Sequence, residues 1–112
     1  MNPFVVEGDW RRYHAGAAMA SGHLAALFLD AARVMESAGV ADAPAHLLPL
    51  AIESLRRAAA TGGQALTGPA ARGDARTIAH HEAVLDPGVR KVYTALTQRI
   101  LVHTARRSDP TE

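Results

Sequence analysis

Residues 10–38, WRRYHAGAAMASGHLAALFLDAARVMESA, decide the fold of this chain, and the first break after them is Gly39. Apolar side chains recur every three or four residues, which is the spacing of one face of an α-helix. The main apolar stripe consists of Tyr13, Ala17, Ala20, Leu24, Leu27, Ala31 and Val34. The polar stripe is narrow, and a helix apolar around so much of its circumference should be buried on several sides. We therefore predict one long central helix that a second polypeptide or domain must cover.

Two glycines, Gly16 and Gly22, interrupt this helix. Each costs about 1 kcal/mol relative to alanine in a helix interior. A close helix contact or a bend explains such glycines most simply. We expect the helix to be shared between subunits.

Three further helices are predicted downstream, over residues 44–61, 74–85 and 87–106. Helix start signals precede each of them, and Asp74 is the expected cap of the third. The apolar faces expected to point inward are Leu47, Leu48, Ala51, Ile52, Leu55 and Ala59; then Ile78, Ala79 and Leu85; then Val89, Val92, Tyr93, Leu96 and Ile100. No segment alternates with period two for long enough to be a strand, so the predicted class is all-α with four helices.

Length and composition favour one small domain. The 112 residues are too few to divide into two useful cores, so residues 10–106 form the expected domain, with an extended lead-in at 1–9 and a frayed tail at 107–112. Apolar residues make up 48% and aromatic residues only 4%. Because an alanine-rich core gains less per residue, we expect some of the stability to come from a partner surface.

Charge and cysteine content exclude several classes of function. Twelve basic and eleven acidic residues are interspersed, so no basic face for nucleic acid is visible. A helix-turn-helix DNA binder would need a basic recognition helix, and the third helix carries only Arg76 and histidines. The chain has no cysteine, which excludes disulfides, zinc–thiolate sites and thiol catalysis.

The N-terminus has no charged-then-apolar signal segment, and no apolar run approaches the roughly 18 residues that span a bilayer. We expect a cytoplasmic protein with no membrane partner. The sequence also lacks HExxH and both nucleotide-binding glycine motifs, and its six histidines do not converge at ligand spacing. We therefore expect this chain alone to bind no metal and no cofactor.

The segment from Leu66 to Asp74, LTGPAARGD, combines a rigid turn, an arginine and a helix N-terminus. Arg72 and the unpaired N–H groups at that N-terminus could together hold a carboxylate or phosphate. The alternative is that Asp74 caps its own helix while Arg72 pairs locally.

On the long helix, Ser21 follows His14 by two turns along one face. Such a pair could line a substrate cleft, with the histidine as general acid and the serine as hydrogen-bond donor. The alternative is a purely structural histidine near a helix start.

These segments resemble a bacterial oxidoreductase family over about residues 12–104. The resemblance is carried by Tyr13-His14-Ala15, and by residues 65–69 leading into Arg72-Gly73-Asp74, with Thr77 and His81 beyond. Members of that family join a Rossmann-like domain to a C-terminal helical domain of unknown function. The helical domain is similar to the C-terminal domains of 6-phosphogluconate dehydrogenase, ketopantoate reductase and pyrroline-carboxylate reductase.

The resemblance implies that this chain supplies the dimer interface and one wall of a substrate cleft, while NAD(P) binds to the Rossmann half. It implies a homodimer, a Rossmann-domain partner and a small anionic substrate. It places these residues at the cleft: His14, Thr67, Gly68, Pro69, Arg72 and Asp74. Relatives commonly carry asparagine at the position of Gly22, and the Rossmann half is missing from this sequence. The alternative is therefore a stand-alone homodimeric helical module with a structural or regulatory role and no chemistry.

Overall fold

A computed structural model of the chain describes residues 8–107, and every regular element in that range is helical. The all-α prediction with four helices is confirmed, since the first predicted helix is one continuous rod. Most of the expected lead-in at 1–9 and of the expected tail at 107–112 lies outside the described residues. The chain divides into two compact parts at the junction of Val40 and Ala41.

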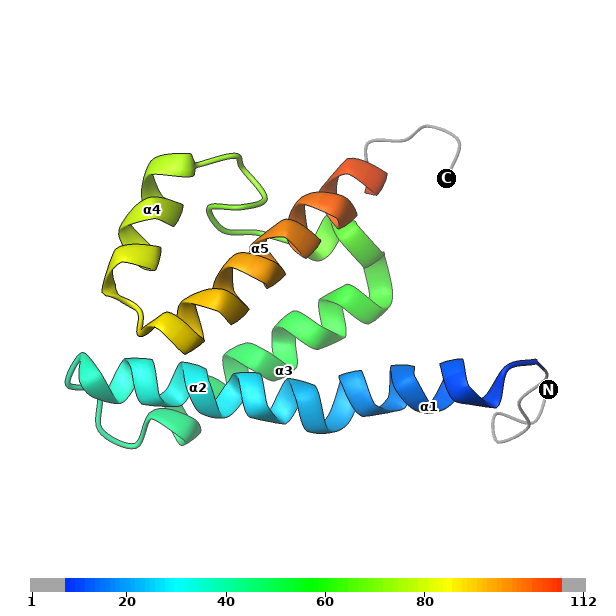
Figure 1. The fold of residues 1–112 in the computed structure, drawn as a ribbon, viewed down its shortest axis with the longest axis horizontal. Helices are drawn as coiled ribbons and strands as arrows, with labels where there is room; N and C mark the ends of the chain where they lie inside the picture. Colours follow the sequence, from blue (N-terminus) through cyan, green and yellow to red (C-terminus); the bar gives the residue numbers. More distant parts are fainter. Residues whose placement is uncertain (1–7, 108–112) are drawn as a thin grey trace. The chain divides into compact units, whose positions relative to one another are not determined.

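The first part is a single rod of three helical segments: α1 (Trp10–Ala18), η1 (Met19–His23) and α2 (Leu24–Ser37) (Figure 1). At its start, the Asp9 carboxylate accepts a 2.9 Å hydrogen bond from the Arg11 N–H, which satisfies a helix N-terminal donor. The middle segment is a turn of π-helix, in which the Leu24 N–H bonds the Met19 carbonyl five residues back. The predicted bend at Gly22 is therefore a local change of helix type.

The rod ends in a Schellman motif. The Gly39 N–H bonds the Glu36 carbonyl at 2.9 Å, and the Val40 N–H bonds the Met35 carbonyl at 3.1 Å. Gly39 has φ +94°, a conformation that a side chain would strain. This explains why the sequence pattern stops at Gly39.

Most residues of the rod are exposed. Ala32 is its one buried residue, and every residue from Trp10 to His23 is exposed. Nothing within 4 Å would meet a Cβ added at Gly16 or Gly22, so close contact inside this copy does not explain either glycine. Shielding by a second subunit stays a prediction.

By length and composition alone, Trp10–Ser37 could also cross a membrane, with a mean hydropathy of 1.2 in its most apolar window. This runs against the sequence-based statement that no apolar segment is long enough. One such helix is weak support for a membrane protein, because core helices of soluble proteins satisfy the same criterion. The absence of a membrane partner stays a prediction.

The second part contains α3 (Ala43–Thr61), η2 (Gly62–Ala65), α4 (Ala75–Val84) and α5 (Pro87–Arg107) (Figure 1). The short 3₁₀ turn η2 packs against both α3 and α5. Within this part, the buried residues of the described chain are Ala43, Ala70 and Thr97.

The inward faces predicted for these helices are only partly covered. Leu47 and Ala51 of α3 are half-buried, whereas Leu48, Ile52 and Leu55 are exposed. Of the residues predicted to face inward from α4, its C-cap and α5, Ile78, Leu85, Val89, Tyr93 and Ile100 are half-buried, while Ala79, Val92 and Leu96 are exposed. Helical spacing correctly groups residues on a face, but it does not show whether one copy of the chain covers that face.

Candidate functional site: the loop between η2 and α4

The segment predicted to hold an anion is an ordered loop. Three backbone hydrogen bonds close it, from the N–H groups of Arg72, Gly73 and Asp74 to the carbonyls of residues 68, 70 and 69, at 2.8–3.2 Å. Ala70 is buried inside these turns. Gly68 and Gly73 have φ +93° and +70°, which glycine adopts without strain. The loop therefore presents Thr67, Gly68 and Pro69 on a fixed backbone.

Asp74 is the N-cap of α4, as predicted. Its Oδ1 accepts the Thr77 N–H at 3.1 Å, and its Oδ2 accepts the Thr77 hydroxyl at 2.7 Å. These two bonds to Thr77, with a further contribution from Arg72, lower the pKa of the Asp74 carboxyl below its ordinary value. Asp74 is therefore a fixed negative charge at the start of α4 near neutral pH.

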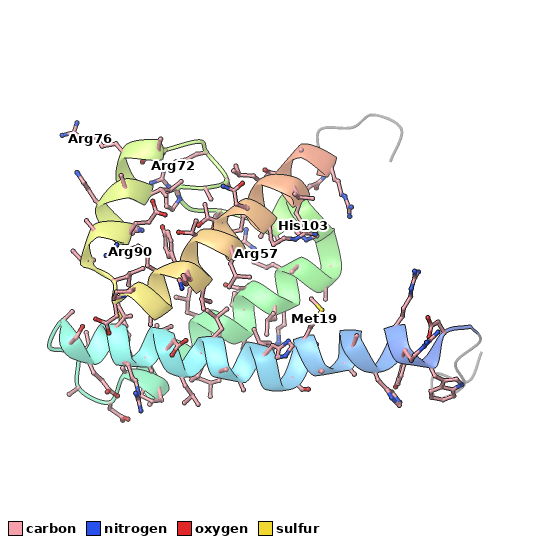
Figure 2. All side chains as sticks on the ribbon, viewed as in Figure 1. Met19, Arg57, Arg72, Arg76, Arg90 and His103 are labelled. Atoms are coloured by element: carbon pink, nitrogen blue, oxygen red, sulfur yellow. The ribbon has the colours of Figure 1, made fainter. Side chains whose placement is uncertain are left out.

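Arg72 folds back onto this cap. One terminal nitrogen of its guanidinium donates to Asp74 Oδ2 at 3.2 Å, and the side chain remains largely exposed. Arg76, the second residue of α4, extends away from the helix (Figure 2). The local pairing considered as an alternative is thus the observed geometry, and a role for Arg72 toward a ligand stays a prediction.

His14 and Ser21 belong to the first part of the chain. The His14 ring packs on Trp10 and Tyr13, with ring centroids 5.8 Å and 5.6 Å apart. The Ser21 hydroxyl donates to the Ala17 carbonyl at 2.7 Å, so its proton is held within its own helix. A general-acid role for His14 and a substrate contact from Ser21 stay predictions.

A polar seam that the sequence did not reveal joins α4 to α5. His81 Nδ1 lies 2.8 Å from the Tyr93 hydroxyl, and the Thr94 hydroxyl donates to Glu82 at 2.6 Å. Burial raises the pKa of Tyr93, and the Glu82 charge adds to the rise. In each pair the two residues are twelve positions apart in the sequence, with Pro87 close to the midpoint. This spacing is the one expected for two helices that form a hairpin with its turn at Pro87.

Among residues 8–107, no three histidine or acidic side chains gather where they could hold a metal ion. The polar geometry of the second part is therefore that of hydrogen-bonded caps and interhelical pairs.

With this geometry in place, the chain can be compared with known proteins. Residues 2–100 match a family described as Domain of unknown function (DUF2520). The chain belongs to this family. The match takes in the long helix, the loop before α4 and most of α5. No curated protein and no solved structure matches the chain.

Proposed function

We propose that this chain is the substrate-binding and dimerisation half of an NAD(P)-dependent oxidoreductase, acting with a Rossmann domain in the same or another polypeptide. The observation that carries the proposal is the exposed first half of the rod, in which every residue from Trp10 to His23 is exposed. Exposed apolar side chains contribute little to the stability of a helix, so this half of the rod gains stability when another surface covers it.

The loop before α4 supports the substrate-binding part of the proposal. Its backbone is fixed by three hydrogen bonds, and it brings the exposed guanidinium of Arg72 to the N-terminus of a helix. An anionic substrate would exchange the Arg72–Asp74 contact for a bidentate contact with the guanidinium. Thr67 and the backbone at Gly68 and Pro69 would form the wall beside it. His14, in the first part of the chain, is proposed separately as a proton donor.

The cofactor belongs to the partner in this proposal. A dinucleotide site needs a turn from a strand into a helix, and residues 8–107 contain no strand. NAD(P) supplies the hydride chemistry when it is bound to the partner domain. This chain's own residues would bind and orient the substrate, and hold a proton at His14.

The second candidate is a stand-alone homodimeric helical module with no chemistry. The observation that favours it is the internal satisfaction of the candidate groups. Asp74 is fully engaged by Thr77 and Arg72, and the Ser21 proton is engaged by Ala17. These contacts stabilise the chain without any ligand.

Reconstitution separates the two candidates. The chain is mixed with the product of a neighbouring reading frame that encodes a β-α-β unit with a glycine fingerprint, and co-purification and NAD(P)H oxidation are measured. The proposal predicts that the mixture oxidises NAD(P)H and that neither protein does so by itself. Micromolar binding of NAD(P)H to the isolated chain would contradict the assignment of the cofactor to the partner.

Two arginine variants locate the substrate contact. Arg72→Ala should raise the KM of the mixture by about 10-fold or more, because a charge-assisted contact is lost. Arg76→Ala is the matched control, because Arg76 lies four residues further on, in the first turn of α4, and points away from the helix. Equal effects of both variants on KM, or none from either, would contradict the assignment of the substrate contact to Arg72.

A further inference from the structure

The π turn changes which residues of the rod share a face. A π turn holds about one residue more than an α turn, so helix faces before and after it are rotated by roughly 100° relative to their α-helical register. The predicted stripe through Tyr13, Ala17, Leu24 and Leu27 is therefore not continuous. Beyond the turn, the face of Tyr13 and Ala17 continues through Ala25 and Leu29 instead.

We call this second face the outer stripe. Its members are Trp10, Tyr13, Ala17, Ser21, Ala25 and Leu29. All six are exposed. The three large side chains are those of Trp10, which is 52% exposed, Tyr13, which is 47% exposed, and Leu29, which is 59% exposed. Leu24 and Leu27, on the other face, are half-buried. The outer stripe is thus an exposed apolar surface along the rod.

The polar atom in the middle of the stripe does not oppose dry burial. The Ser21 hydroxyl donates to the Ala17 carbonyl at 2.7 Å, so the group keeps a hydrogen bond when water is removed. At the N-terminal end, Trp10 and Tyr13 pack edge to face with centroids 5.7 Å apart. This leaves a preformed aromatic pair facing outward.

The part of the stripe from Tyr13 to Leu29 is symmetric in size about Ser21. Ala17 and Ala25 lie four residues on either side of it, and Tyr13 and Leu29 lie eight residues on either side. In an antiparallel pair with its two-fold axis at Ser21, small residues meet at the centre and large residues meet at both ends. Crossing helices approach most closely at their centre and diverge at their ends, so this order of sizes fits the pair.

The charges at the ends of the rod favour the antiparallel direction. Asp9, Arg11 and Arg12 give the N-terminal end a formal charge of −1 + 2 = +1, and Asp30, Arg33 and Glu36 give the other end −2 + 1 = −1. An antiparallel pair places these opposite charges side by side, whereas a parallel pair would place like charges together.

The available area is sufficient for a dimer of moderate affinity. The exposed surface of the outer stripe is roughly 500 Å² per copy, from two half-exposed aromatic residues, one leucine and three small residues. Two copies could therefore bury about 1,000 Å² in total. This total is larger than most crystal-packing contacts and lies at the lower limit of specific interfaces.

We propose that the outer stripe pairs with the outer stripe of a second copy, antiparallel, with the two-fold axis at Ser21. The inference rests on the dimerisation included in the proposed function and names the surface and direction that would carry it. The Arg72 loop takes no part in it, so the two proposals fail separately.

Disulfide trapping tests the pairing, because the natural chain has no cysteine. Ser21→Cys lies on the two-fold axis, so oxidation should link two copies about 100-fold faster than chance encounter of thiols in solution. Met19→Cys is the matched control, two residues away and 63% exposed but on the opposite side of the helix. It should form no disulfide-linked dimer under the same oxidation.

A mixture of Tyr13→Cys and Leu29→Cys chains tests the direction. Antiparallel pairing predicts disulfides between unlike chains, and disulfides between like chains would overturn it. Light scattering on the natural chain completes the test. A dimer that links through Met19→Cys and not Ser21→Cys overturns the outer stripe but keeps dimerisation.

A species of about 12 kDa at micromolar concentration removes dimerisation from the proposed function as well. The Arg72 and Arg76 comparison still tests the substrate contact in that case. The proposal would be overturned if the natural chain co-sediments with neutral phosphatidylcholine vesicles while the Ser21→Cys chain forms no disulfide-linked dimer. The stripe would then be assigned to a lipid surface.

Discussion

His81 Nδ1 lies 2.8 Å from the hydroxyl of Tyr93, and this pair connects α4 to α5 across the turn at Pro87. The two rings also pack edge to face with centroids 5.8 Å apart. Next to them, the Thr94 hydroxyl donates to Glu82. The few buried side chains in this part make such polar contacts a large share of what holds the two helices together.

Tyr93→Phe should lower the free energy of unfolding by about 0.5–1 kcal/mol, because the ring packing stays while the hydrogen bond is lost. Urea denaturation followed by circular dichroism measures the change. Tyr13→Phe is the control, since the Tyr13 hydroxyl lies on the exposed rod. Combining Tyr93→Phe with His81→Ala should give less than the sum of the single effects, and strict additivity would show that the pair does not interact in solution.

The pKa of Tyr93 should lie above the ordinary value of 10.0, because burial disfavours the phenolate and the Glu82 charge adds to this. The chain has two tyrosines, so a Tyr13→Phe variant isolates Tyr93 in an ultraviolet titration. A folded-state pKa above the unfolded one means that the associated stability is fully present below pH 10 and is lost as pH rises through the folded value. A midpoint at or below 10 would contradict the structure.

Replacing Asp74 should destabilise α4, because its carboxylate satisfies the Thr77 N–H at the helix start. Its lowered pKa sets the pH dependence: the stability is present above the ordinary pKa of about 3.8 and is lost as pH falls through the folded value. The difference between the natural chain and Asp74→Asn in urea denaturation should therefore be larger at about pH 7 than at about pH 2. A difference that does not change with pH would show that the charge of Asp74 is not used.

Pro49→Ala should stabilise the chain by about 1–3 kcal/mol, because Pro49 lies inside α3 and cannot donate a backbone hydrogen bond to the turn before it. Pro44→Ala is the matched control. Pro44 lies in the first turn of the same helix, where the N–H has no helical partner, so its replacement should change stability little. A loss of stability in Pro49→Ala, measured by the urea midpoint, would show that α3 needs the proline.

The four helices were predictable because each has strong local signals at its ends. Gly39 ends the first, Asp74 caps the third and Pro87 opens the fourth, and these depend on backbone rules that act within one turn. The π turn was not predictable, since Gly22 indicates only that the helix is weakened there. Burial was also not predictable, because it depends on surfaces that periodicity does not describe.

In the candidate site, too, some contacts could be predicted from the sequence and others could not. The cap of Asp74 follows from its position in the sequence, and the structure confirms it. Its pairing with Arg72 was one of two alternatives that spacing alone could not separate. The contact of His81 with Tyr93 required knowledge of the hairpin register, which only the completed turn between α4 and α5 provides.

The scarcity of buried side chains has a calorimetric consequence. With Ala32, Ala43, Ala70 and Thr97 as the buried residues of the described chain, melting one copy newly hydrates little hydrocarbon. The heat-capacity increment of an isolated copy should then fall below the usual 12–15 cal/mol/K per residue, and its endotherm should be low and broad. Concentrating the sample should sharpen that endotherm and move it to higher temperature if assembly provides the missing interior.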